Sequence, residues 1–221
     1  MIVLLINWFY IFIILYTFGL ITCELLKRCG ILFESLNEIR IDKLIILGFV
    51  SFTTLLSISS LFYRIGFVSH VLVEIAVLFT VYHFFDYWKE IPNNCRKYIR
   101  NIDIPFGRIF LLFSLLLIIL WSVQEVWEYD SNFYHLQAIK WIEEYGTIPG
   151  LGNLFDRLAN NNSNFFPSAY FNYSHFNLPK FHALNSFFLS MMVCIWVNLI
   201  ASFRGNFRFI IFNLFFIICF F

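Results

Sequence analysis

Five long apolar runs constrain the fold of this chain more than any other feature of its sequence. A helix needs about 20 apolar residues to cross the hydrocarbon core of a membrane. The runs carry few charged residues or none, and they are residues 1–23, 44–63, 65–85, 109–124 and 181–203, with the start of a sixth at 209–221. The sequence therefore predicts an all-α fold, a multi-pass transmembrane helix bundle with five full spans and a partial sixth.

The composition excludes several other classes of protein. Hydrophobic residues make up 60% of the 221 residues and charged residues only 13%, whereas a soluble domain carries about 25% charged residues. The same excess of apolar residues excludes a disordered chain. The net charge is only +1, so no strong positive field indicates nucleic acid as a partner. The partner that this composition predicts is the lipid bilayer.

The connections between the runs alternate between many and few basic residues, which predicts the orientation of the spans. The basic residues of the first and third connections are Lys27, Arg28, Arg40 and Lys43, and Lys89, Arg96, Lys97, Arg100 and Arg108. The second connection holds Arg64 alone, and the fourth, residues 125–180, contains only Lys140, Arg157 and Lys180. We therefore expect the N-terminus and the loop 125–180 on the external side of the membrane.

The long external loop is expected to be partly helical. Leu136, Ile139 and Ile142 follow a helical spacing within residues 133–145, and Gly146 is a natural C-terminal stop. We expect a short amphipathic helix here, at the outer surface of the membrane. The Gly-Leu-Gly sequence that follows predicts a tight turn rather than a nucleotide-binding loop.

Asp130 is the candidate catalytic residue of this loop. It follows the fourth apolar run closely, and a carboxylate at the mouth of a membrane cavity can take a proton from an acceptor hydroxyl as general base. That chemistry suits transfer of a sugar from a lipid-phosphate carrier, whose phosphate lies at the membrane surface. Glu125 and Glu128 are alternatives for the same role, and Asp130 is equally suited to cap the predicted helix.

The sequence YDSNFYH at residues 129–135 places an Asp-x-x-x-Tyr motif directly after a span. This motif resembles the first external loop of the GT-C membrane glycosyltransferases, which use polyprenyl- or dolichyl-phosphate sugars. The sequence that follows, to about residue 190, is similar to a subset of bacterial multi-pass proteins. The resemblance implies a GT-C-like region over residues 109–221, preceded by three additional spans over residues 1–108, in a bacterial inner membrane.

The resemblance also implies roles for individual residues. Asp130 matches the catalytic aspartate of the GT-C loop, and Tyr134 matches the tyrosine four residues on. The polar positions that recur in the bacterial subset, and for which substrate contacts are implied, are His135, Asn153, Arg157 and Asn161. Several GT-C families have Glu directly after the aspartate, whereas this chain has Ser131. No metal ligand set is therefore expected, and a divalent metal cofactor has no support from the motif.

His70 and Glu74 form a rival candidate site within the third apolar run. They are four residues apart and lie on one face of a helix inside the membrane, where ionisable side chains act as proton relays or substrate contacts. The alternative interpretation is structural. In that case the pair forms hydrogen bonds within itself and with the hydroxyl-rich second run, whose polar side chains are Ser51, Thr53, Thr54, Ser57, Ser59 and Ser60.

These patterns leave three functions open. The first is a membrane glycosyltransferase that transfers a sugar from a polyprenyl-phosphate donor on the external face. The second is a proton-coupled transporter that uses His70 and Glu74, and the third is a non-catalytic membrane protein or fragment. The last apolar run has only 13 residues after Arg208, and GT-C enzymes need more than six helices. We therefore expect the chain to be the N-terminal part of a longer protein.

Overall fold

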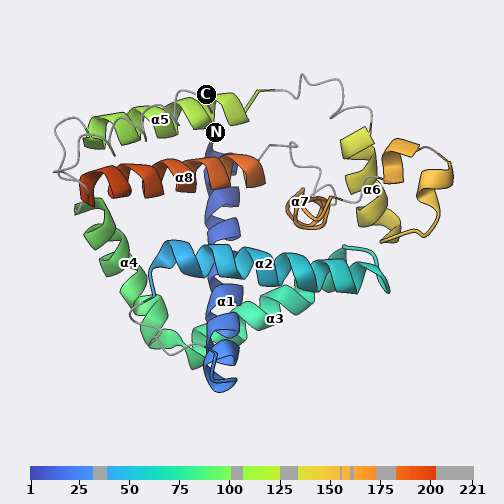
Figure 1. Cartoon of the computed structure of the whole chain (residues 1–221), viewed down its shortest axis with the longest axis horizontal. Helices are drawn as coiled ribbons and strands as arrows, with labels where there is room; N and C mark the ends of the chain where they lie inside the picture. Colours follow the sequence, from blue (N-terminus) through green and yellow to red (C-terminus); the bar gives the residue numbers. More distant parts are fainter. Residues whose placement is uncertain are drawn as a thin grey trace.

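The fold is known from a computed structural model, which describes residues 1–31, 39–100, 107–124, 134–154, 156–159, 162–172 and 183–202. The regular secondary structure in these ranges is helical (Figure 1). The α-helices are α1 Ile2–Arg28, α2 Ile41–Ser60, α3 Phe67–His83, α4 Phe85–Arg100, α5 Gly107–Ser122, α6 Leu136–Tyr145, α7 Phe165–Phe171 and α8 Ala183–Ser202. Two short 3₁₀ helices, η3 Leu151–Asn153 and η4 Asp156–Ala159, lie between α6 and α7. The predicted all-α class is confirmed.

Three of the described helices are long and apolar enough to cross a membrane, namely α1, α2 and residues Ala183–Ala201 of α8. Helices α3 and α4 meet this criterion only as a pair, and they are bent by 88° where they meet. Helix α5 is apolar but shorter, at 16 residues. The described residues therefore hold three candidate spans, or four if the bent pair is one span. The sixth apolar run, residues 209–221, lies outside them.

Two glycines allow α1 and α2 to approach closely where they cross (Figure 1). A Cβ atom at Gly48 of α2 would overlap the carbonyl oxygen of Leu15 and lie 2.8 Å from the amide nitrogen of Gly19. A Cβ atom at Gly19 would likewise overlap the carbonyl oxygen of Leu44. Small residues at such crossings let the backbones of membrane helices pack directly against each other. On another side of α1, helices α5 and α8 lie side by side (Figure 1).

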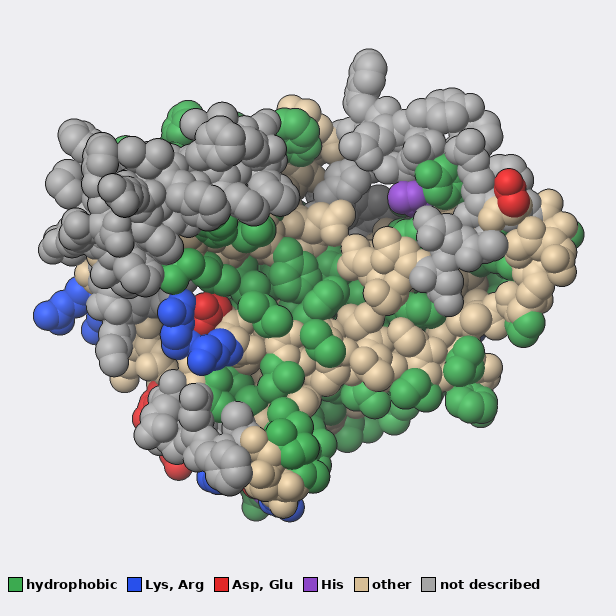
Figure 2. Space-filling model, viewed as in Figure 1, with side chains coloured by type: hydrophobic (Ala, Val, Ile, Leu, Met, Phe, Trp, Pro, Cys, Tyr) green, Lys and Arg blue, Asp and Glu red, His purple; other side chains and the backbone are tan. Residues whose placement is uncertain are grey.

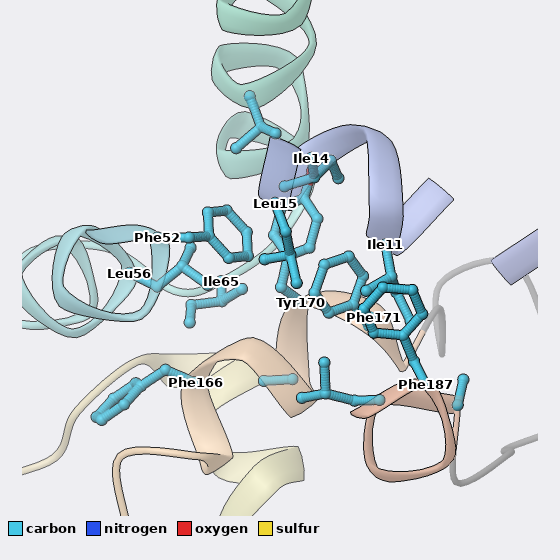
Figure 3. Close-up of a cluster of buried hydrophobic side chains, with 14 of the residues drawn as sticks. Ile11, Ile14, Leu15, Phe52, Leu56, Ile65, Phe166, Tyr170, Phe171 and Phe187 are labelled. Atoms are coloured by element: carbon cyan, nitrogen blue, oxygen red, sulfur yellow. The ribbon is translucent and has the colours of Figure 1, made fainter. Parts of the chain in front are cut away.

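The main hydrophobic core includes a helix from the long loop as well as the predicted spans. Helix α7 lies far along the chain from α1 and α2, yet it packs between them and α8. Figure 3 shows Tyr170 and Phe171 of α7 directed into a cluster with Ile11, Leu15 and Phe52. Tyr170 is fully buried there. The long loop is therefore part of the packed structure and not a separate appendage.

The loop also binds the short connection between α2 and α3. The amide of Thr147 donates to the carbonyl of Ser60 at 2.8 Å, and the hydroxyl groups of the same two residues are 2.7 Å apart. The amide of Ile65 donates to the carbonyl of Ile142 at 3.2 Å. Gly146 has a φ of +82°, and a Cβ atom on it would lie 2.7 Å from the carbonyl oxygen of Ser60. The end of α6 is thus held against the α2–α3 turn by backbone and side-chain contacts.

A second, smaller core lies at the other end of α1. There Tyr16, Leu20 and Cys23 of α1 pack with Leu44 of α2 and with side chains from the α3–α4 junction. The ring of Tyr16 meets that of Trp88 edge-on at 5.2 Å. The end of α1, the beginning of α2 and the beginning of α4 therefore lie together.

Helix α4 was not predicted, because the sequence analysis treated the basic stretch after residue 85 as a connection. Its apolar residues recur every three or four positions, as Phe85, Trp88, Ile91, Cys95 and Ile99. Trp88 and Ile91 pack against the smaller core, so this apolar face stabilises the helix although most of its other positions are polar. The helical spacing was the signal in the sequence, and the charged residues between these positions obscured it.

The helix predicted in the loop 125–180 is confirmed as α6, which begins at Leu136 and ends before Gly146. Its apolar stripe differs from the expectation of an anchor in the membrane surface. Ile142 is buried in the main core and Ile139 packs against it, so the stripe contacts protein. The tight turn predicted after α6 is also confirmed, since Gly150 has a φ of +82° and its carbonyl accepts from the amide of Asn153 at 2.9 Å.

Candidate functional site

A polar cluster joins three helices that are distant in the sequence. The hydroxyl of Tyr10 in α1 donates to the carboxylate of Glu74 in α3 at 2.7 Å. The hydroxyl of Tyr170 in α7 lies 3.0 Å from that of Tyr10. The ring of His70 in α3 packs against the ring of Tyr170, with 4.1 Å between their centroids. We call these four residues the tyrosine cluster.

The local sequence explains why these side chains meet. His70 and Glu74 are one helical turn apart, so both face the same side of α3. Tyr170 belongs to the apolar helix α7, whose residues Phe165, Phe166, Ala169 and Phe171 are all buried. Burial of these neighbours carries the Tyr170 hydroxyl into the core, where a phenol needs a hydrogen-bond partner. Tyr10 supplies that partner.

The directions of the hydrogen bonds can be assigned from the number of protons. The Tyr10 hydroxyl has one proton, and it is donated to Glu74. The bond between the two tyrosines is therefore donated by Tyr170, whose proton points at the Tyr10 oxygen. The result is a directed chain from Tyr170 through Tyr10 to Glu74. The hydrogen bonds of such a chain polarise one another, and a proton can move along it between the core and the exposed carboxylate of Glu74.

The structural interpretation of His70 and Glu74 expected the hydroxyl groups of α2 as partners, and the structure differs. Five of those hydroxyls bond to carbonyl oxygens of α2 itself, and they are Ser51, Thr54, Ser57, Ser59 and Ser60. Hydroxyl groups in apolar helices commonly bond to the preceding turn in this way. The described partner of Glu74 is instead Tyr10, and His70 packs against Tyr170.

A second polar contact holds the loop together. The side-chain amide of Asn172 donates to the carboxylate of Glu143 at 2.6 Å. Glu143 is only 3% exposed, and it belongs to α6, whereas Asn172 follows α7 directly. A buried carboxylate needs such a donor. This contact therefore fixes α6 and α7 relative to each other.

The predicted substrate residues lie at several places in the loop. Tyr134 and His135 stand at the beginning of α6 with their rings 4.4 Å apart, and His135 also packs on Phe165 of α7 at 5.4 Å. Asn153 belongs to the turn at η3, and Arg157 lies in η4. The structure thus brings His135 to α7 but leaves Asn153 in a separate turn. The remaining two predicted residues, Asp130 and Asn161, lie outside the described residues.

The sequence analysis missed Tyr10, Tyr170, Glu143 and Asn172. No local pattern marks the two tyrosines, because they are 160 positions apart and meet only when α7 enters the core. Glu143 carried one signal, a charged residue next to the apolar positions of α6. As for metals, no group of three or more His, Cys, Asp or Glu side chains within the described ranges is placed to hold an ion.

The chain matches the family described as "Domain of unknown function (DUF8201)" over residues 1–221. The chain belongs to the DUF8201 family. No curated protein and no solved structure matches it. The match includes both the helices that carry Tyr10, His70 and Glu74 and the loop that carries Tyr170. The DUF8201 domain thus contains the whole tyrosine cluster.

Proposed function

We propose that this DUF8201 chain is part of a GT-C-like membrane glycosyltransferase, which transfers a sugar from a polyprenyl-phosphate donor on the external face of a bacterial inner membrane. The observation that carries the proposal is the return of the long loop onto the apolar helices, where Tyr170 of α7 meets Tyr10, His70 and Glu74. An enzyme that uses a lipid-linked donor needs its loop residues at the surface of its spans, because the reacting phosphate lies there.

The packing also supports the proposed orientation. The α2–α3 connection and the loop 125–180 are the two basic-poor connections, and they are in direct contact through Ser60 and Thr147. The end of α1 and the beginning of α4, which border the two basic connections, lie together at the smaller core. Connections on the same side of a membrane can contact each other, whereas connections on opposite sides are separated by the bilayer. The contacts therefore agree with the proposed external N-terminus and external loop.

Asp130 is the proposed general base. In the sequence it stands between α5 and α6, and α6 is held against the ends of α2 and α3. The carboxylate takes the proton of an acceptor hydroxyl, whose oxygen then attacks the anomeric carbon of the donor sugar. The bond from that carbon to the phosphate oxygen breaks, and the phosphate leaves on its polyprenyl carrier. Tyr134, His135, Asn153, Arg157 and Asn161 are the proposed substrate contacts.

The test is transfer of a labelled sugar from a polyprenyl-phosphate donor by the full-length protein in membranes. The Asp130→Asn variant is expected to lose transfer, because an amide cannot accept the proton. Glu144→Gln is the matched control, since Glu144 is an acid of the same loop with a 47% exposed side chain, and it is expected to retain transfer. Full turnover by Asp130→Asn would overturn the assignment.

A second function, proton-coupled transport, is favoured by one observation, the directed chain from Tyr170 through Tyr10 to Glu74. It predicts that Glu74→Gln abolishes transport in membrane vesicles while Asp130→Asn does not. If the chain is non-catalytic, neither substitution changes anything beyond stability. The two variants therefore distinguish all three functions in one pair of assays.

A further inference from the structure

A groove lined by three arginines lies between α4 and α5. Its volume is about 510 Å³, and its lining residues are Pro92, Cys95, Arg96, Ile99 and Arg100 of α4 and Arg108 of α5. Figure 2 shows Lys and Arg side chains at the left of the molecule, on the side where α4 lies in Figure 1, together with acidic side chains, and further Lys and Arg side chains at the bottom. The groove is thus basic at its polar positions and apolar at the others.

The charged residues of α4 are unevenly distributed along its length. Both acids, Asp86 and Glu90, lie in the first half together with Lys89, whereas Arg96, Lys97 and Arg100 lie in the second half. The next acid in the sequence, Asp103, falls in residues 101–106, outside the described residues. Among the residues described as lining the groove, the only charged ones are arginines. A negatively charged ligand is therefore the one that the lining fits.

The angle between α3 and α4 is compatible with a position of this groove at a membrane surface. The two helices are bent by 88°, so if α3 crosses the bilayer, α4 runs along its surface. Arg108 lies in the first turn of the apolar helix α5, whose residues Ile109, Leu112 and Phe113 are 63%, 68% and 58% exposed. An apolar surface thus begins directly at the arginines.

We propose that this groove binds the phosphate of an anionic phospholipid headgroup, with the acyl chains along the exposed face of α5. Guanidinium groups bind phosphate oxygens through paired hydrogen bonds. Basic pockets next to membrane helices on the cytoplasmic side are suited to such headgroups. The apolar surface of α5 favours a lipid over free phosphate, because inorganic phosphate has no apolar part that could cover this surface. The proposal is independent of the function proposed above.

Cys95 provides a direct test, because it is one of the residues that line the groove. The full chain is placed in nanodiscs of phosphatidylcholine, with or without about a third phosphatidylglycerol, and alkylated with the neutral reagent N-ethylmaleimide. Bound phosphatidylglycerol is expected to slow alkylation of Cys95. The exposed Cys29, beside Lys27 and Arg28, is the internal control for the general effect of surface charge.

The Arg100→Gln/Arg108→Gln variant is expected to lose the protection, since loss of one charge-assisted hydrogen bond weakens binding by about tenfold or more. The Arg100→Lys/Arg108→Lys variant keeps the charge and loses the paired geometry, so it should give partial protection. Lys27→Gln/Arg28→Gln is the matched control and should leave protection of Cys95 unchanged. Monodisperse elution of each variant verifies that it is folded.

Three results would overturn the proposal. If phosphatidylglycerol slowed the alkylation of Cys95 and Cys29 equally, the membrane surface potential alone would explain the slower reaction. Protection that persists in the Arg100→Gln/Arg108→Gln variant would mean that the arginines do not bind the lipid. Protection of Cys95 by about 10 mM inorganic phosphate in nanodiscs without phosphatidylglycerol would assign the groove to free phosphate.

Discussion

Replacement of Tyr170 by Ala tests whether the loop is held in the core as the structure describes. Tyr170 is fully buried, its ring lies 5.1 Å from that of Phe52 and 4.1 Å from that of His70, and its hydroxyl bonds to Tyr10. Truncation of a buried aromatic side chain to Ala costs about 3–5 kcal/mol. Because α7 would lose its main anchor, most of this cost should appear as undocking of the loop rather than unfolding of α1 and α2.

The expected size of the effect follows from this cost. Each 1.4 kcal/mol changes an equilibrium about tenfold, so Tyr170→Ala should increase the open population of the loop by about 10²- to 4 × 10³-fold. Tyr170→Phe removes only the hydroxyl, and Tyr10 keeps its bond to Glu74. It should cost about 0.5–1.5 kcal/mol, an increase of at most about tenfold.

Limited trypsin digestion of the purified chain in detergent measures this population. Lys140 lies within α6, so cleavage after it requires the loop to open, and its rate follows the open population when opening is fast relative to cleavage. Tyr63→Ala is the matched control, because Tyr63 lies near the loop but is 72% exposed. If Tyr170→Ala is cleaved no faster than Tyr63→Ala, the loop is not anchored by Tyr170 and the reasoning is refuted.

Three further substitutions test other contacts. Gly48→Ala should destabilise the fold by about 1–3 kcal/mol, seen as a lower thermal denaturation temperature, because the added Cβ would overlap the Leu15 carbonyl. An unchanged denaturation temperature would contradict the close α1–α2 crossing. Glu143→Ala should cost about 1–3 kcal/mol, seen as faster cleavage after Lys140, because Asn172 loses its acceptor; cleavage at the wild-type rate would argue against that contact. Gly146→Ala should cost about 1–3 kcal/mol in the same digestion assay, since its φ is +82°, and a neutral effect would refute the described turn.

The sequence predicted well what depends on local pattern. Apolar runs without charge predicted the helical class, and Gly146 predicted the end of α6 because only glycine takes a φ of +82° without strain. Helix α4 shows the limit of this approach. Its apolar face has the spacing of a helix, but the connection contains five basic residues and was therefore interpreted as a loop.

The candidate site was predicted only in part, because it depends on contacts between distant segments. The spacing of His70 and Glu74 placed both on one face of a helix, and they do share the tyrosine cluster. Their partners Tyr10 and Tyr170 are 160 residues apart, so no local spacing marks them. Tyr170 meets α1 only because the apolar helix α7 is buried, and the sequence analysis did not predict that helix.

The measurement that tests the account most directly is a disulfide between the loop and the α2–α3 turn. The hydroxyl oxygens of Ser60 and Thr147 are 2.7 Å apart, which suits a bridge between cysteines at these positions. In a chain whose own cysteines are replaced by Ala, Ser60→Cys/Thr147→Cys should form the disulfide in membranes, seen after denaturation as loss of the gel shift caused by a polyethylene-glycol maleimide, which reductant restores. The account predicts near-complete bridging in the double variant and none in either single variant. Free thiols in the double variant under oxidising conditions would contradict the return of the loop onto the spans.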